Sequence, residues 1–302
     1  MATSQAVTML DAEAYDALRP RRHWTRGLWT LIKQNPLAFA GLIVIVALAV
    51  VAIFAPLIAP YDYGDFRSGT PKEDPSWSHV FGTDHLGRDV FSRVVYGTRI
   101  SMTVAFFSVV LGTGAAMVVG IFSGYVGGSV DNGIQRLVDT VIAFPQLLLL
   151  LVLAQVLGPS MQTVILAVGI GVIAPVTRVV RGAVLSERNN QYVEAARALG
   201  ASTFRILVFH IAPNMVALAI IIASTLFGVA ILAEASLSFL GLGIPVPNPS
   251  WGTDVSLARG NPPLHIWWAL FPGAAITLTV LGFNLLGDGL RDILDPRLRG
   301  RL

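Results

Sequence analysis

Long apolar stretches separated by short polar segments dominate the chain of 302 residues. A helix needs about 20 apolar residues to cross a hydrocarbon core about 30 Å thick, at a rise of 1.5 Å per residue. Each stretch that lacks Asp, Glu, Lys and Arg is long enough for at least one crossing. The pattern therefore predicts an all-α polytopic membrane protein. These uncharged stretches are 34–61, 100–130, 140–177, 206–233 and 260–287.

The third uncharged stretch is long enough for two helices. Gly158 and Pro159 divide it into halves of spanning length, because neither residue favours a helix interior. We therefore expect six spans, and an even number places both termini on one side. The predicted spans are 37–59, 100–126, 134–157, 161–181, 213–242 and 266–287.

The orientation follows from the distribution of the 21 Lys and Arg residues. Most of them lie in the N-terminal leader, in the loop 182–212 and in the C-terminal tail. Cytoplasmic loops carry the excess of Lys and Arg in membrane proteins. We therefore expect both termini in the cytoplasm and the chain in a bacterial inner (plasma) membrane. This topology explains the excess of basic residues, a formal net charge of +3, so the charge does not require a nucleic-acid partner.

The topology divides the chain into five parts. Residues 1–36 form a cytoplasmic leader, in which Trp24, Leu28, Leu31 and Ile32 have the spacing of an amphipathic helix lying on the inner leaflet. The other predicted parts are the first span at 37–59, an extracytoplasmic segment at 60–99, a five-span core at 100–287 that includes the cytoplasmic loop 182–212, and a cytoplasmic tail at 288–302.

Composition narrows the function further. Charged residues make up 13% of the chain, against about 25% in soluble domains. The absence of cysteine excludes disulfides, thiolate metal sites and cysteine nucleophiles. The five histidines are scattered, with no second ligand at helical spacing. A membrane-embedded enzyme is therefore the weakest hypothesis.

The loop 182–212 has the most informative pattern in the chain. Tyr192, Ala195, Ala196 and Leu199 recur at helical spacing and predict a short helix with one exposed apolar face. Glu194 lies in its first turn, where a negative charge suits the helix dipole. Gly200 supplies the left-handed residue that ends helices. Ser202 is placed to cap a second helix that starts at Thr203.

This loop resembles the EAA loop of ATP-binding-cassette importer permeases. The resemblance rests on Glu194-Ala195-Ala196, then Gly200, then Pro213. In that family the short helix docks into a groove of the ATPase subunit and carries its motion to the membrane helices. The family pattern often ends in Leu-Pro, whereas Ala212 precedes Pro213 here. The resemblance assigns ATPase coupling to Glu194, Ala195, Ala196, Arg197, Leu199, Gly200, Ala201 and Pro213. The alternative is an ordinary interfacial helix without a partner.

Further segments are similar to the C-type permease subunit of the dipeptide and oligopeptide (and nickel) importers. They occur in the family's order, at 35–38, 55–60, 81–90, 233–243 and 284–292. The resemblance implies the type I ABC importer permease fold. It also implies a second homologous permease subunit, one or two ATP-binding-cassette ATPase subunits, an extracytoplasmic substrate-binding protein and contact with membrane lipid.

ATP hydrolysis is expected on separate chains. A phosphate-binding loop has the form GxxxxGK[ST], and neither Lys33 nor Lys72 follows a glycine. The chain is therefore predicted to be no enzyme and to bind no cofactor or metal itself. ATP and magnesium are expected to bind the partner ATPase subunits.

Two regions on the predicted outer side supply candidate contacts. Between Asp84 and Tyr96, Asp84/Arg88 and Asp89/Arg93 have i, i+4 spacing and predict an amphipathic helix on the outer membrane surface. The proline-rich loop 244–265 is expected to cap the outer mouth or line a cavity. The candidates for docking the binding protein are Asp84, Arg88, Asp89, Trp251 and Asp254. The alternative role for this region is a structural brace.

Glu234 is the one carboxylate inside a long apolar span. It lies roughly 31 Å from Pro213 at helical rise, towards the outer mouth. Ionisable groups in spans usually face the bundle interior or a water-filled path. Glu234, Ser236 and Ser238 are therefore candidates for the translocation pathway. The favoured alternative is a hydrogen-bonded carboxylate between helices.

These features predict a permease subunit that forms half of a peptide pathway and couples to separate ATPases. The first alternative is the same importer family carrying nickel or another small solute. A more distant alternative is an ion-coupled secondary transporter, which would usually show repeated halves and charges at the bilayer midplane.

Overall fold

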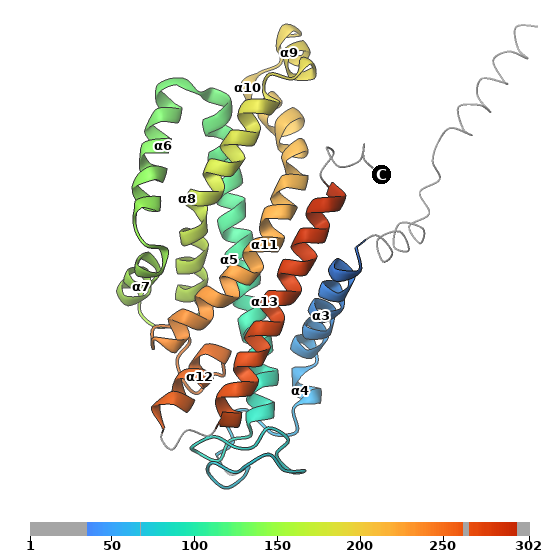
Figure 1. The fold of residues 1–302 in the computed structure, drawn as a ribbon. Coiled ribbons are helices and arrows are strands. Elements are labelled where there is room, and N and C mark those ends of the chain that lie inside the picture. The colour runs from blue at the N-terminus through green and yellow to red at the C-terminus, as the bar shows by residue number, and fades with distance from the viewer. Residues whose placement is uncertain (1–34, 67, 262–265, 295–302) are drawn as a thin grey trace, which may run out of the picture.

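A computed structural model describes residues 35–66, 68–261 and 266–294, which are predominantly helical and contain no strand (Figure 1). The predicted leader helix at Trp24–Ile32 lies outside the described residues, as does the end of the tail from 295 onwards. The described helices are α3 (Pro36–Ile53), α4 (Ala55–Ile58), α5 (Val90–Val126), α6 (Gly128–Ala143), α7 (Gln146–Leu157), α8 (Met161–Glu187), α9 (Gln191–Ala198), α10 (Thr203–Ile206), the π-helix η1 (Leu207–Ile211), α11 (Ala212–Phe239), α12 (Trp251–Gly260) and α13 (Ile266–Leu294).

The described chain has five helices long and apolar enough to cross a membrane, by length and composition. The number becomes six if the bent pair α6 and α7 is one span. Each predicted span coincides with one of these elements in the expected order. Several boundaries differ by six residues or more: α5 begins ten residues and α6 six residues earlier than predicted, α8 continues six residues further to Glu187, and α13 continues past residue 287 to Leu294.

The third span is broken where the sequence changes from polar to apolar. Helix α6 ends at Ala143, α7 starts at Gln146, and their axes are bent by 92°. Phe144 is extended, with φ −80° and ψ 137°, because the ring of Pro145 disfavours a helical residue before it. A hydropathy pattern is blind to this change of direction.

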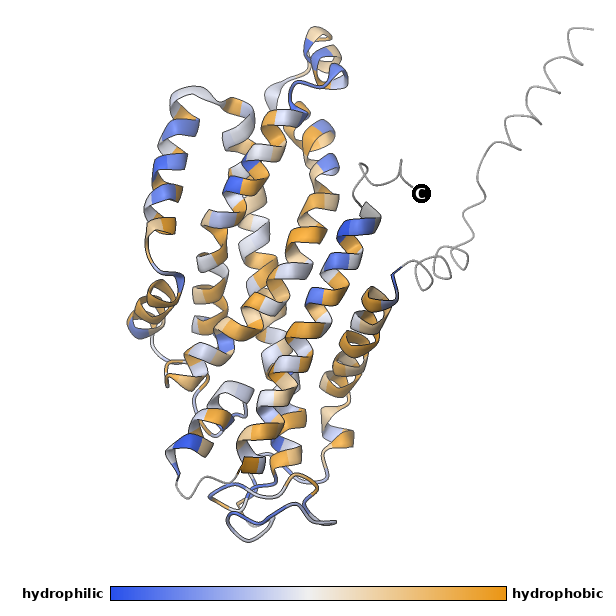
Figure 2. Ribbon diagram, viewed as in Figure 1, coloured by the Kyte–Doolittle hydropathy of each residue, from blue (hydrophilic) through white to orange (hydrophobic). Residues whose placement is uncertain are grey.

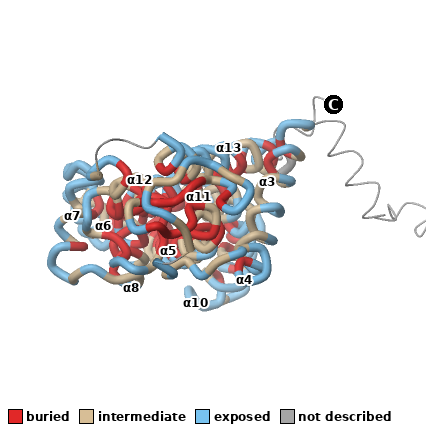
Figure 3. Tube along the Cα trace, turned by 90° about the horizontal axis from the view of Figure 1, so that it is seen from below, coloured by how far each residue is buried: buried red, intermediate tan, exposed pale blue. Residues whose placement is uncertain are grey.

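Helices α5 and α8 form the centre of the bundle, and glycines let them approach closely. A Cβ atom on Gly112 would lie 2.6 Å from the carbonyl oxygen of Gly169, and one on Gly120 would lie 2.9 Å from that of Thr177. Small residues permit such contact between membrane helices. Buried residues gather around α5 and α11, with α3 at the edge of the bundle (Figure 3).

Helix α3 is attached mainly to α13. Only Ala38 and Gly41 are buried in it. A Cβ atom on Gly41 would lie 2.6 Å from the carbonyl oxygen of Gly282, and one on Gly289 would lie 2.0 Å from the Cβ atom of Ala38. The remaining side chains of α3 are partly or fully exposed and strongly apolar (Figure 2). This distribution is typical of a helix that faces lipid.

Two polar regions occupy opposite ends of the bundle (Figure 1). Helices α9 and α10 lie at one end, which we call the α9 end. The segment 60–89 and α12 lie at the other, which we call the loop end. The two candidate regions from the sequence therefore lie at opposite ends.

Candidate functional site

The helix–turn–helix at the α9 end forms as predicted from the sequence. Gly200 has φ +79°, and the N–H groups of Gly200 and Ala201 donate to the carbonyl oxygens of Arg197 (3.0 Å) and Ala196 (3.1 Å). These two bonds make a Schellman motif, which ends α9. The hydroxyl of Ser202 then accepts from the N–H of Arg205 at 3.3 Å and caps α10. The local structure is confirmed, and its role in coupling stays a prediction.

One part of the predicted apolar face is wrong. Ala196 does not lie on the exposed face but is buried with Val193 in a cluster that contains Val184 and Ile206. The reason is that α10 and the end of α8 cover this side of α9. The three-residue spacing of Val193 and Ala196 carried this signal in the sequence.

The exposed face of this region is nevertheless apolar. Leu199 is 88% exposed, Phe204 is 71% exposed and Tyr192 is 38% exposed. Phe204 was not among the predicted coupling residues, although it follows the cap at Ser202. Tyr192, Ala195, Leu199 and Phe204 together form an exposed surface, which we call the apolar knob. Large apolar side chains left exposed on a rigid turn are suited to insertion into a partner.

Hydrogen bonds attach α9 to two long helices. The Tyr192 hydroxyl donates to the carboxylate of Glu187 on α8 and accepts from Nδ2 of Asn214 on α11 (2.8 Å). Burial raises the pKa of the Tyr192 hydroxyl above its ordinary value, and the neighbouring Glu187 raises it further. The phenol therefore stays protonated and able to donate.

Arginines attach the same region to α5. Nη1 of Arg188 donates to the carbonyl oxygen of Gly124 at 2.9 Å. The guanidinium of Arg197 lies over the ring of Tyr125, with its Cζ atom 5.5 Å from the ring centroid. Side-chain contacts therefore connect this end of the chain to α5, α8 and α11.

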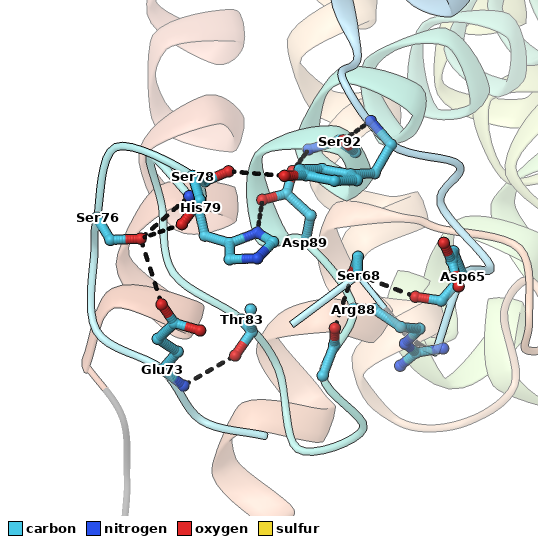
Figure 4. A network of polar contacts seen from close by, with 12 residues as sticks. Asp65, Ser68, Glu73, Ser76, Ser78, His79, Thr83, Arg88, Asp89 and Ser92 are labelled. Atoms are coloured by element: carbon cyan, nitrogen blue, oxygen red, sulfur yellow. Dashed lines mark hydrogen bonds and ion pairs between the residues drawn. The ribbon is translucent and has the colours of Figure 1, made fainter. Parts of the chain in front are cut away.

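The loop end contains a buried polar network rather than the predicted surface helix (Figure 4). Residues 84–89 are not helical, because the Asp84 carboxylate accepts from the N–H groups of Leu86 (2.8 Å) and Arg88 (3.0 Å) and closes a turn. The Asp84–Arg88 ion pair does form, at 2.5 Å. Helix α5 begins only at Val90.

The predicted pair between Asp89 and Arg93 does not form. Asp89 caps α5 by accepting from the N–H of Ser92 at 2.7 Å, and its other oxygen contacts Nδ1 of His79 at 3.0 Å. Arg93 instead binds Asp254 of α12. The Asp89 carboxylate can either cap α5 or pair with Arg93 at i+4, and in this structure it caps the helix.

Burial also changes the interpretation of the docking candidates. Asp84, Arg88, Asp89, Trp251 and Asp254 are each at most 2% exposed. The indole Nε1 of Trp251 donates to the carbonyl oxygen of Val94 at 3.1 Å. In this structure none of these five side chains presents a surface to a binding protein. The geometry supports the alternative role, a brace between segment 60–89, α5 and α12.

Glu234 is fully buried between α5 and α11. Its carboxylate accepts from the hydroxyls of Ser101 (2.9 Å) and Ser238 (2.8 Å). This is the geometry of a hydrogen-bonded carboxylate between helices, the favoured alternative. Ser238 is buried with it. Of the three pathway candidates, only Ser236 lines a hollow, a pocket of about 400 Å³ between α7, α11, α12 and α13.

No group of three or more His, Asp or Glu side chains is placed to hold a metal ion within residues 35–66, 68–261 and 266–294. Many polar side chains at both ends are engaged in structural contacts. The described residues thus form the apolar knob, attached to α5, α8 and α11, at the α9 end and a buried polar network at the loop end.

Comparison of the sequence with known proteins shows the family to which the chain belongs. Residues 116–300 match the family model described as the inner membrane component of binding-protein-dependent transport systems. Residues 24–75 match the N-terminal transmembrane domain of oligopeptide transport permease C.

Full-length relatives are similar over almost the whole chain. The dipeptide transport system permease protein DppC of Alkalihalophilus pseudofirmus is 42% identical over 287 residues, which cover 95% of this chain and 93% of the relative. DppC of Bacillus subtilis is 39% identical over 290 residues (95% and 90%). The glutathione transport system permease protein GsiD of Escherichia coli O157:H7 is 42% identical over 273 residues (90% of each chain).

The chain belongs to the permease family of binding-protein-dependent ABC importers. It is an all-α, multi-pass membrane permease, as the sequence predicted. Membership implies that it works with ATPase subunits and a substrate-binding protein.

Proposed function

We propose that the chain is the permease subunit through which an ABC importer brings short peptides into a bacterial cell. The observation that carries the proposal is similarity along 95% of the chain to permeases named for dipeptide transport. A permease named for transport of glutathione, itself a tripeptide, is similar at 42% identity. Both substrates are small and carry an amide backbone with a free carboxylate.

The α9 end is proposed to face the cytoplasm, with both termini on that side of the inner membrane. The Lys and Arg distribution supports this orientation. The apolar knob then meets an ATPase subunit, which binds ATP and magnesium, while this chain binds neither. Glu194, exposed in the first turn of α9, and Pro213, at the start of α11, flank the same contact.

Coupling is proposed to use the side-chain contacts of α9. When the ATPases close, a push on the knob acts on α8 and α11 through Tyr192, and on α5 through Arg197. Because the contacts of Tyr192 are hydrogen bonds, they transmit displacement in both directions. A second, homologous permease subunit completes the pathway, and an extracytoplasmic protein delivers the peptide at the loop end.

Reconstitution tests this proposal. The complete complex, purified from native membranes and placed in liposomes with its binding protein, should take up a labelled dipeptide only when ATP is supplied on the α9 side. Glutathione and nickel are assayed in parallel. Uptake of nickel without any peptide would overturn the assignment to peptides, and uptake driven by an ion gradient without ATP would overturn the importer mechanism.

A further inference from the structure

Helix α6 carries a polar stripe along one side. Asn132, Arg136 and Asp139 recur at i, i+4 and i+7, and all three are exposed. Leu137, 67% exposed, points to a different side of the helix. Figure 2 shows the polar bands on α6, in contrast to the uniformly apolar α3. Part of one predicted span is therefore strongly amphipathic.

Helix α8 adds two arginines to this stripe. Nη2 of Arg178 donates to the Asp139 carboxylate, and Nε and Nη2 of Arg181 donate to the two oxygens of Asp131, at 2.7 and 2.5 Å. Arg136 lines the same hollow, of about 530 Å³, together with Arg178, Arg181 and Asp139. Among the described residues, the Arg136 guanidinium has no hydrogen-bond or ion-pair partner.

The charges therefore do not cancel. Three guanidinium groups lie around this hollow, and two carboxylates pair with Arg178 and Arg181. The positive charge of Arg136 remains uncompensated by the described part of the chain. A hollow with this balance attracts a carboxylate rather than an ammonium group.

The exposed charges around the hollow make lipid an unsuitable neighbour. Arg178 lies nine residues before the end of α8 at Glu187, about 14 Å inside the helix at 1.5 Å per residue. Its side chain is 50% exposed, and that of its partner Asp139 is 57% exposed. Charged groups within membrane-spanning helices usually face the bundle interior or a water-filled path. Because no described part of this chain covers them, they face water or another subunit.

Two further hollows continue from this one towards the loop end. The first, of about 320 Å³, lies at the bend between α6 and α7 and is lined by Gln146, Gly171 and Pro175. The second is the pocket of about 400 Å³ lined by Leu147 and Ser236. Helices α6 and α8 line the first two hollows, and α7 contributes to the last two. The three therefore follow one side of the chain, from the α9 end to the loop end.

We propose that this side of the chain borders the aqueous route through the membrane, and that Arg136 attracts the substrate's carboxylate in the half of the route nearest the α9 end. The α6–α7 bend marks the change from a polar to an apolar lining. That the carboxylate belongs to a peptide rests on the proposed function. The exposure of the stripe to water and the positive potential around it do not depend on the proposed function.

Accessibility to thiol reagents tests the route directly, because the chain contains no cysteine. Asn132→Cys and Leu137→Cys are introduced separately into the full complex in inside-out membrane vesicles. We expect the Asn132→Cys thiol to react with charged methanethiosulfonates at least tenfold faster than the Leu137→Cys thiol. Equal slow reaction at both positions would overturn the aqueous route.

The sign of the potential is tested with the same variant. At Asn132→Cys, an anionic reagent should react severalfold faster than a cationic one, after correction for their rates with a free thiol. Adding Arg136→Gln should remove most of this preference, and adding Arg136→Lys should keep it. An unchanged preference in the Gln double variant would overturn the role of Arg136.

Transport by the reconstituted complex tests the carboxylate. Arg136→Gln should lower dipeptide uptake severalfold, Arg136→Lys should restore most of it, and ATP hydrolysis by the complex should be retained. Normal uptake by the Gln variant would overturn the substrate contact. If wild type imports no peptide but Asn132→Cys reacts as expected, the proposed function fails while the aqueous route stands.

Discussion

Arg93 near the start of α5 donates two hydrogen bonds to a single oxygen of Asp254 in α12, from Nε at 2.8 Å and from Nη2 at 2.6 Å. The two residues are 161 positions apart and at most 2% exposed. A further bond from Nη1 of Arg93 reaches the carbonyl oxygen of Tyr63 at 3.2 Å. The guanidinium of Arg93 therefore joins the start of α5 both to α12 and to segment 60–89.

Replacing one partner of this pair should destabilise the loop end more than replacing both. Arg93→Met leaves the Asp254 carboxylate buried without its counter-charge, at a cost of about 3–5 kcal/mol. The double variant Arg93→Met/Asp254→Leu removes both charges and should recover most of that loss. Thermal unfolding and limited proteolysis of the purified complex measure the difference. If the double variant is as destabilised as the sum of Arg93→Met and Asp254→Leu made separately, the pair contributes nothing through its mutual attraction.

The left-handed residue after α9 should distinguish two substitutions that are similar in size but differ in their tolerance of a positive φ. Gly200→Asn keeps a residue that tolerates φ +79°, whereas Gly200→Val forces a β-branched side chain into it, at about 1–2 kcal/mol or more. No atom lies within 4 Å of a Cβ atom at this position, so packing is not the cause. We expect the Val variant to lose bound ATPase subunits and peptide uptake, and the Asn variant to keep both.

The measurement is recovery of ATPase subunits with the permease from native membranes, together with peptide uptake. The Val variant is first shown to be present in the membrane at the wild-type level. Full recovery of coupled ATPases with Gly200→Val would refute the role of the helix end.

The packing of α3 against α13 should be sensitive to the addition of a single methyl group. Gly289→Ala places a Cβ atom 2.0 Å from that of Ala38, so the two helices must separate. Gly273→Ala, in the same helix, meets no atom within 4 Å and serves as the control. Alanine is favoured over glycine in a helix by roughly 0.5–1 kcal/mol, which both variants gain. The Gly289 variant should nevertheless unfold at a lower temperature than wild type, and the Gly273 variant should not.

Acid should loosen the loop end through His85. Its ring stacks on Trp268 with centroids 5.0 Å apart, and its Nδ1 atom is buried without a partner. Burial lowers the pKa of His85 below its ordinary value of 6.5; Arg88, Arg93 and Lys72 act in the same direction, and Asp84 acts against them.

The sign follows from proton binding. Below pH 6.5 the opened chain binds a proton at His85 before the folded chain does, so stability is full above this pH and is lost as the pH falls. His85→Phe keeps the stacking without titrating. Proteolysis of segment 60–89 at pH 7.5 and pH 5 should accelerate more in wild type than in His85→Phe. Equal acceleration would assign the effect to other groups.

The sequence predicted those parts of the fold that depend on local pattern. The spans follow from runs of apolar residues, and the end of α9 at Gly200 and the cap at Ser202 follow from residues with narrow conformational preferences. Pro145 predicts a kink inside the third span, because proline disfavours a continuing helix, but neither it nor hydropathy gives the size of the bend, which is 92°.

The candidate sites were harder to predict because their partners are distant in sequence. Arg93 has an acidic residue four positions before it, yet its partner is Asp254. The docking candidates were chosen for charge or for their place in the polar loop 244–265, and folding buried all five. The stripe of Asn132, Arg136 and Asp139 was present in the sequence at helical spacing, but its meaning depends on Arg178 and Arg181 lying beside it in space.

The attachment of α3 has a consequence for how the protein is made. Helix α3 leaves the ribosome before the other described helices, and Gly282 and Gly289, which form its seat, lie in the last of them. Until α13 is synthesised, α3 can contact lipid and other helices but lacks the α13 surface on which it packs in the finished protein. Insertion into the bilayer and completion of the bundle are therefore separated in time by the synthesis of almost the entire chain. A truncated product that lacks α13 would leave α3 without its main packing partner and attached chiefly to α5.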